Sequence, residues 1–409
     1  MNDVRGAAAA HALPSHAASS DPYEYSLFLG GPLFQLIHHA HLSGDALELL
    51  RRRVFAICVF AWVPLLVLAV TSGRAWGTAV RVPFLADIEV HLRFLLALPL
   101  LIVAELIVHL RLRDLVAQFL KRDLIAESSR AKFDAVIPSA LRLRNSIVAE
   151  IILIALVYFV GIAYVWPRVG ALSVPTWYGT PETGALQLSP AGWWYVYVSL
   201  PLFQFMLLRW YFRLFIWIRL LWQISRCELK LVPTHPDQAG GLGFLARIPN
   251  ALAPLLAAHG VVLAGMIANQ IFYHGAKLPD FAPELVTVVG FLLVLVLAPL
   301  LLFVPKLAAL KRRGLTEYGV LAQRYVREFD DKWMRGSAPA GEALLGSGDI
   351  QSLADMANSF AVIRGIKPVP ITRQSLIQLV VITLLPVAPL ALTMISAKEL
   401  MTRLVKIVL

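Results

Sequence analysis

Four ionisable residues fall inside long apolar runs of this sequence, where a charge is costly. Glu105 and His109 are four positions apart in one run, and Arg209 and Arg213 are four apart in another. Residues four apart share one face of a helix. An ionisable side chain inside a membrane span costs about 2.5–3.5 kcal/mol on insertion scales, so its position is informative. We predict a buried Glu105–Arg209 pair that neutralises both charges and leaves a polar cavity open to the cytoplasm, fit for an ion, a proton or a small anion.

A structural alternative needs no ligand. Long basic side chains near the end of a span reach the interface and keep their charge in water. This alternative accounts for Arg209, Arg213 and His109. It accounts less well for Glu105, because a short carboxylate about six residues inside the span does not reach far.

A polar loop follows the apolar run that contains Arg209 and Arg213. Residues 233–243 read PTHPDQAGGLG. Gly240 and Gly241 tolerate positive φ, so backbone N–H groups in this loop are able to converge on a phosphate or a lipid head group. His235 and Asp237 are close enough in sequence to form a hydrogen bond. The alternative is a tight turn that re-enters the membrane, shaped by proline and glycine and capped by Asp237.

The elements that must position these residues are transmembrane helices. Of the 409 residues, 58% are hydrophobic and only 15% are charged, and the mean hydropathy is +0.69. A soluble domain is nearer ~25% charged, and ~20 apolar residues cross a bilayer as a helix. We predict an all-α, polytopic membrane protein of about seven transmembrane helices. The expected spans cover residues 54–71, 91–110, 147–166, 191–224, 251–273, 285–304 and 375–395.

The formal net charge of +11 is explained by membrane topology. The excess Lys and Arg residues sit in alternate loops, as the positive-inside rule requires. Nucleic acid is therefore not an expected partner, and the lipid bilayer is. Arg51, Arg52 and Arg53 precede the first span, so we expect a cytoplasmic N-terminus.

The predicted topology divides the chain into five regions. One of them, the cytoplasmic insert between the sixth and seventh spans, contains two amphipathic helices, 307–333 and 350–360, the second capped by Ser347 or Asp349. Each has one apolar stripe, which must pack on the other helix, the membrane or another subunit. The regions are a disordered N-terminus (1–22), a cytoplasmic amphipathic segment (23–53), a transmembrane domain of six spans (54–305), a cytoplasmic helical insert (306–373) and the seventh span with a tail (374–409).

No pattern predicts a reaction. The two cysteines have no metal-ligand spacing, and no nucleophile has a base at a credible spacing. Asp87, Glu89 and His91, with His274, are residue types that bind metals, but two carboxylates and a histidine before a span are commonly just a solvated helix start. We therefore predict no catalytic residue, no metal and no cofactor. A channel or transporter for a small ion or anionic solute is the first hypothesis. The alternative is a non-catalytic subunit or scaffold that docks a partner, or a second copy, through 307–333 and 350–360. An enzyme acting on a lipid head group through His235 and Asp237 ranks last.

Several short segments carry a resemblance. They are THPDQAGGLGFL at 234–245, DIQSLAD at 349–355, LLRWYFR at 207–213, VPFL at 82–85 with residues 95–105, and GPL at 31–33 with LLRRR at 49–53. Together they resemble a family of uncharacterised multi-pass inner-membrane proteins of bacteria, from about residue 23 onward. The resemblance implies a multi-pass protein located in the bacterial inner membrane, and it brings no activity, ligand or site residue.

Overall fold

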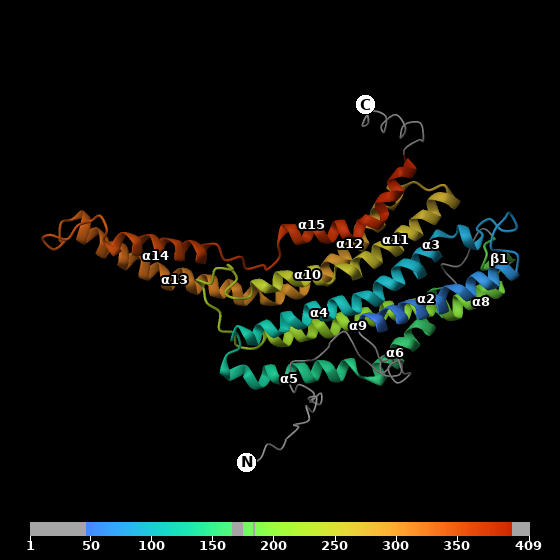
Figure 1. Ribbon diagram of the computed structural model, residues 1–409, viewed down its shortest axis with the longest axis horizontal. Coiled ribbons are helices and arrows are strands. Elements are labelled where there is room, and N and C mark those ends of the chain that lie inside the picture. The colour runs from blue at the N-terminus through green and yellow to red at the C-terminus, as the bar shows by residue number, and fades with distance from the viewer. Residues whose placement is uncertain (1–45, 166–174, 183–184, 395–409) are drawn as a thin grey trace, which may run out of the picture.

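Long helices lying side by side form nearly all of the regular structure, which confirms the all-α prediction. The computed structural model describes residues 46–165, 175–182 and 185–394. Helices α2 (Ala46–Thr71), α4 (Leu98–Lys121), α9 (Leu200–Ser225) and α11 (Ala253–His274) run along the long axis of the molecule (Figure 1). The expected amphipathic segment, up to residue 45, and the C-terminal tail from residue 395 lie outside the described residues.

The remaining elements cover or extend these helices. They are α3 (Ile88–His91), α5 (Glu127–Arg144), α6 (Ile147–Leu156), β1 (Gly179–Glu182), β2 (Ala185–Leu188), α8 (Pro190–Trp194), α10 (Ile248–Ala251), α12 (Ala282–Leu297), α13 (Val304–Phe329), α14 (Gly348–Arg364) and α15 (Arg373–Leu384). Short π-helical segments join α3 to α4 and α8 to α9. A 3-10 segment joins α12 to α13, so each pair forms one long rod.

Six helices in the described residues are long and apolar enough to cross a membrane. A seventh is present if α5 and the following segment, bent by 47° at residues 145–146, count as one span. The six single spans are Leu50–Thr71, Ile88–Lys121, Pro190–Ser225, Gly243–His274, Leu278–Met334 and Arg373–Met394. The chain is thus a multi-pass membrane protein by the length and composition of its helices.

One helix boundary and one loop differ from the expectation. Helix α2 begins at Ala46 and passes through Arg53 without a break, whereas the sequence predicted a start at residue 54. Arginine and glutamate are good helix formers, so a helix continues past the point where apolar residues end. The long loop before the fourth span contains a hairpin that sequence analysis did not foresee, in which Gly179 pairs with Leu188. Ser189 is the N-cap of the next helix, and its hydroxyl oxygen accepts from Gly192 N at 3.0 Å.

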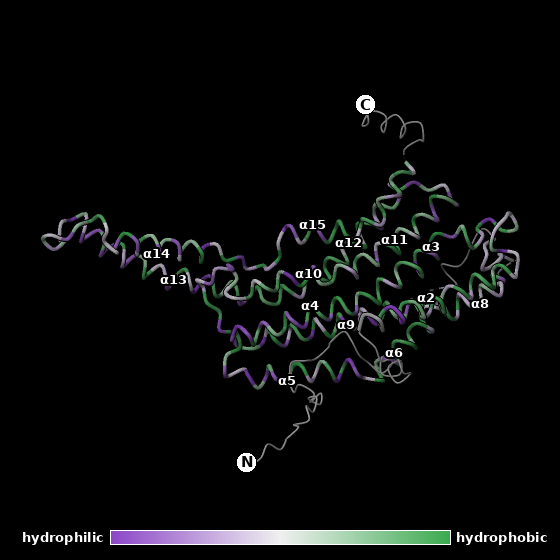
Figure 2. The backbone as a smooth tube through the Cα atoms, viewed as in Figure 1, coloured by the Kyte–Doolittle hydropathy of each residue, from purple (hydrophilic) through white to green (hydrophobic). Residues whose placement is uncertain are grey.

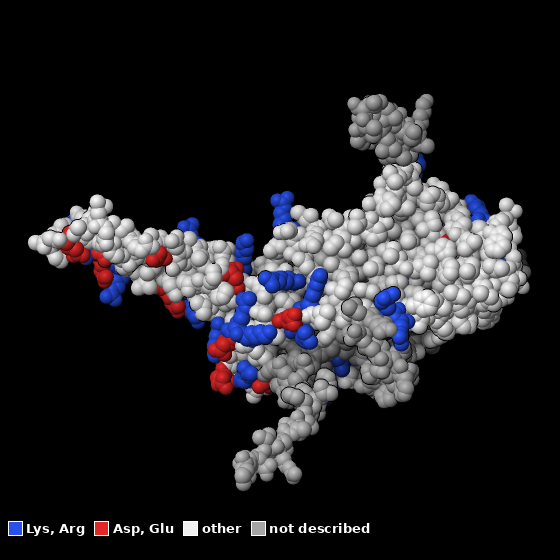
Figure 3. Space-filling view, viewed as in Figure 1, with Lys and Arg blue, Asp and Glu red and all other residues white. Residues whose placement is uncertain are grey.

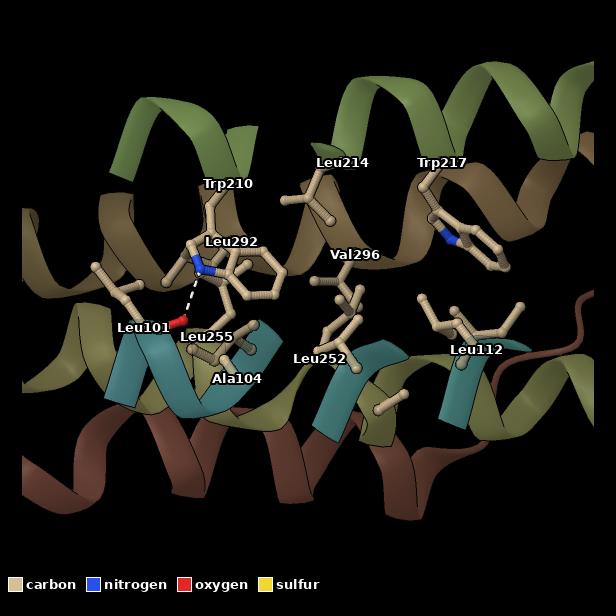
Figure 4. Close-up of a cluster of buried hydrophobic side chains, with 14 of the residues drawn as sticks. Leu101, Ala104, Leu112, Trp210, Leu214, Trp217, Leu252, Leu255, Leu292 and Val296 are labelled. Atoms are coloured by element: carbon tan, nitrogen blue, oxygen red, sulfur yellow. Dashed lines mark hydrogen bonds between the residues drawn. The ribbon is translucent and has the colours of Figure 1, made fainter. Parts of the chain in front are cut away.

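The core lies where α4, α9, α11 and α12 meet. Figure 4 shows leucine, valine and alanine side chains from these helices around Trp210 and Trp217. The Trp210 indole N–H donates to the carbonyl oxygen of Leu101 at 3.0 Å, which satisfies its polar atom inside the apolar core. Apolar residues dominate these helices (Figure 2).

Helices α13 and α14 form a hairpin, called here the arm, that projects beyond the bundle (Figure 1). Their apolar stripes pack partly on each other. At the far end, Asp349 accepts from Lys332 Nζ at 2.8 Å and from the Trp333 indole at 2.9 Å. Ser347 is the N-cap residue of α14, but its hydroxyl makes no capping bond. On the face in Figure 3, charged residues gather on the arm and the adjoining end of the bundle.

Candidate functional site

One glutamate and three arginines meet inside the bundle, and we call them the arginine cluster. Glu105 Oε1 on α4 lies 2.7 Å from Arg213 Nη1 and 3.6 Å from Arg209 Nη1, both on α9. Glu105 Oε2 accepts from Arg53 Nη1 of α2 at 2.8 Å. The four side chains are 1–10% exposed. The predicted Glu105–Arg209 pair is therefore present, within a larger group.

Helix geometry explains why the group forms. Arg209 and Arg213 are one turn apart on α9, and the Trp210 bond to α4 holds that helix against Glu105. Arg53 turns inward from α2, while Arg51 and Arg52 beside it are exposed. Sequence analysis missed Arg53 because three consecutive arginines before an apolar run indicate a membrane boundary. The helical phase of α2 was the only signal that one of them faces the bundle.

Counted by themselves, the three guanidinium groups and the one carboxylate of the cluster carry a formal charge of +2, and Arg53 and Arg209 also make contacts beyond Glu105. Arg213 is 2% exposed, and its Nη2 is a buried donor without a hydrogen-bond partner. A buried donor left unsatisfied costs about 1–3 kcal/mol, and more for a charged group. This chemistry suits an anionic group, because carboxylates and phosphates accept two parallel bonds from a guanidinium.

His109 is one turn from Glu105 on α4 but does not belong to the cluster. Its side chain is half-buried, and its Nδ1 is buried without a hydrogen-bond partner. The described residues show no ion pair between His109 and a carboxylate. Within the described residues, His109 thus makes no bond to Glu105, although the sequence placed both on the same helix face.

The polar loop directs its backbone N–H groups onto its own aspartate. Asp237 accepts from the backbone N of Ala239 at 2.9 Å, Gly241 at 3.1 Å and Gly243 at 2.8 Å. His235 Nδ1 lies 2.8 Å from Asp237 Oδ1. Burial raises the pKa of Asp237, but the three backbone donors and then His235 outweigh it, so the pKa lies below its usual range. The Asp237 carboxylate thus takes the place that an external anion would occupy.

Close packing fixes this loop at the base of the arm. Gly240 and Gly241 have φ of +62° and +100°, and a Cβ on Gly240 would collide with the Leu310 side chain of α13. A Cβ on Gly314 of α13 would lie 2.7 Å from Pro233. The backbone oxygen of Gln238 accepts from Lys367 N at 3.1 Å. These contacts make the loop the joint between the bundle and the arm.

A second buried carboxylate lies near the hairpin end of the bundle. Asp87 is 3% exposed and accepts from the Trp177 indole at 2.8 Å and from Asn269 Nδ2 at 2.7 Å. From the sequence, Asp87 was considered only as part of a low-ranked metal site with Glu89, His91 and His274. Asp87 follows a proline-containing turn and caps α3 through Val90 N, which is a structural role. Within the described residues, no three His, Cys, Asp or Glu side chains form a group that could hold a metal ion.

Comparisons with protein-family models, with curated proteins and with solved structures give no match for this chain. The chemistry of the site therefore carries the functional argument. Among the described residues, the arginine cluster combines buried charge, an excess of cations and an unsatisfied donor.

Proposed function

We propose that this chain is an integral protein of the bacterial inner membrane that binds a small anionic solute at the arginine cluster and conducts or transports it. The observation that carries this proposal is the buried Arg213 Nη2 without a partner, beside a group with a formal charge of +2. Guanidinium groups remain charged at any physiological pH, so they hold this charge without a switch. Arg209 and Arg213 would bind the anion, and Glu105 would keep the two side chains oriented.

The proposed orientation places the arm and the N-terminus in the cytoplasm. Basic residues are concentrated in the loops on that side of the predicted topology, and charge gathers at the arm end in Figure 3. The arginine cluster then lies toward the cytoplasmic end of the spans. The polar loop joins this end of the bundle to the arm and, in this proposal, couples movements of the two.

Flux of anions into liposomes tests the proposal. Protein reconstituted into liposomes is given chloride, nitrate, phosphate and small carboxylates in turn, and uptake is compared with Arg213→Gln. Arg219→Gln is the matched control, because Arg219 lies on the same helix but donates to Ser139 Oγ outside the cluster. One charge-assisted contact contributes about 1.5–3 kcal/mol, so Arg213→Gln should lower uptake about tenfold or more. Equal uptake by wild type and Arg213→Gln for every anion that is moved refutes the proposal.

A second candidate function is that of a scaffold, favoured by the far end of the arm. Leu345 is 87% exposed and Met334 is 75% exposed, next to the exposed Leu344. Exposed apolar patches commonly mark interaction sites. In this case a second copy or a partner protein would dock on the arm, and Leu344→Ser with Leu345→Ser would abolish the complex on native gels. Retention of the complex in this variant would exclude the arm end as the docking site.

A further inference from the structure

An apolar groove opens on the side of the bundle, and no residue of the arginine cluster lines it. It has a volume of about 510 Å³ and lies between α4, α9, α11 and α12. Each of these four helices belongs to a segment that is able to span a membrane. Its wall includes Leu101, Phe203, Leu207, Val262, Met266 and Val288. A groove with this lining at membrane depth is in contact with hydrocarbon, so its occupant must be apolar.

The size of the groove selects the kind of occupant. At about 510 Å³, the groove lies within the range of roughly 300–1,000 Å³ that holds one small apolar ligand. A single lipid acyl chain has the shape and polarity that this space requires.

The polar groups along the wall are already satisfied. His259 Nδ1 lies 2.8 Å from the carbonyl oxygen of Leu255 and therefore carries the proton, because a carbonyl only accepts. His259 Nε2 then accepts from the Tyr211 hydroxyl at 2.7 Å. The Thr287 hydroxyl donates to the carbonyl oxygen of Pro283 at 2.7 Å. The interior of the groove thus leaves no polar side-chain group that needs a partner.

Glu284, at the rim of the groove, is the one polar lining residue without a partner among the described residues. It lies in the first turn of α12, and its side chain is exposed. Within the described residues, no hydrogen bond or ion pair engages its carboxylate. A carboxylate at the mouth of an apolar groove complements a cationic head group attached to an apolar chain.

We propose that this groove binds one bilayer phospholipid with an amine head group, its acyl chain against Phe203, Val262 and Met266 and its ammonium paired with Glu284. Because lipid tails are as apolar as the groove wall, van der Waals packing of the chain in the groove, and not its removal from water, favours this lipid over bulk lipid. Selectivity among lipids comes from the Glu284 pair. The proposed lipid site and the arginine cluster have no residue in common.

Native mass spectrometry of protein from nanodiscs of mixed phosphatidylethanolamine and phosphatidylglycerol tests this proposal. Met266→Trp fills the groove and should remove one tightly bound lipid per chain. Val286→Trp is the control, because Val286 is 72% exposed on α12 and does not line the groove. Melting curves verify that both variants fold.

Glu284→Gln separates the head-group contact from the chain contact. This variant should still hold one lipid, but the ratio of ethanolamine to glycerol lipid should fall to that of the bulk bilayer. A lipid count that is the same in wild type and Met266→Trp overturns the proposal. Equal lipid loss in Val286→Trp overturns it as well, as does a head-group ratio that Glu284→Gln leaves unchanged.

Discussion

Replacing Glu105 by glutamine removes the carboxylate around which Arg53, Arg209 and Arg213 are arranged. Breaking a buried ion pair by removing one partner costs about 3–5 kcal/mol, because the other charge stays buried. Coulomb's law gives the same scale: one pair about 4 Å apart contributes about 4 kcal/mol at an effective dielectric constant of about 20. Repulsion among the three guanidinium groups adds to the loss, and the 10% exposure of Arg53 reduces it. We expect a loss of about 3–5 kcal/mol in the free energy of unfolding.

Chemical unfolding in mild detergent, followed by tryptophan fluorescence, measures this loss. Glu317→Gln is the matched control, because its ion pair with Arg313 is exposed and should contribute less than about 1 kcal/mol. The double variant Glu105→Gln/Arg213→Gln should be less destabilised than the sum of the single variants. The difference should be about 0.5–3 kcal/mol, since neighbouring charges are not additive. A free energy of unfolding for Glu105→Gln within 1 kcal/mol of the control refutes the view that this carboxylate neutralises the buried arginines.

Two further predictions concern the loop at the base of the arm. Asp237→Asn should lower the free energy of unfolding by about 2 kcal/mol, because the amide replaces a carboxylate that accepts three backbone N–H groups. The folded pKa of Asp237 is lowered, so its contribution is complete above the unfolded pKa of about 3.9 and is lost as the pH falls from there through the folded pKa. Denaturation curves across this pH range should be steeper in pH for wild type than for Asp237→Asn, and parallel curves would contradict the assignment. Gly240→Ala should loosen the arm and speed its proteolysis, because the new methyl group meets the Leu310 side chain. Gly336→Ala is the control, because it introduces similar backbone strain at a position with open space around it. Equal cleavage of the two variants would contradict the role of this loop as the joint between the bundle and the arm.

The four-residue spacing of charged residues within apolar runs explains why three of the four residues of the arginine cluster could be predicted. Glu105, Arg209 and Arg213 were identified because charges within apolar runs are conspicuous and four-residue spacing defines a helix face. Arg53 was missed because its role depends on the phase of α2, which continues through the membrane boundary. The same spacing grouped His109 with Glu105, but a common face on one helix does not decide which neighbour each residue meets.

The loop shows a similar division. Its glycines and Asp237 predicted both an anion site and a tight turn, since both use positive φ and free N–H groups. The structure shows the tight turn, because Asp237 itself accepts the three backbone N–H groups that an external anion would need. The hairpin of β1 and β2 was not foreseen, because four-residue strands leave too short an alternation to detect.

The sequence by itself determined the class of this protein, because the length and polarity of an apolar run decide whether a helix is able to cross a bilayer, whatever its neighbours are. The sequence also determined which ionisable residues lie inside apolar runs, where a charge is energetically costly. Only the tertiary structure decided that three arginines share one glutamate, that the loop is closed upon Asp237, and that a groove remains between α9 and α12. Those features depend on the relative rotation and separation of helices distant in sequence, which packing sets and local pattern does not.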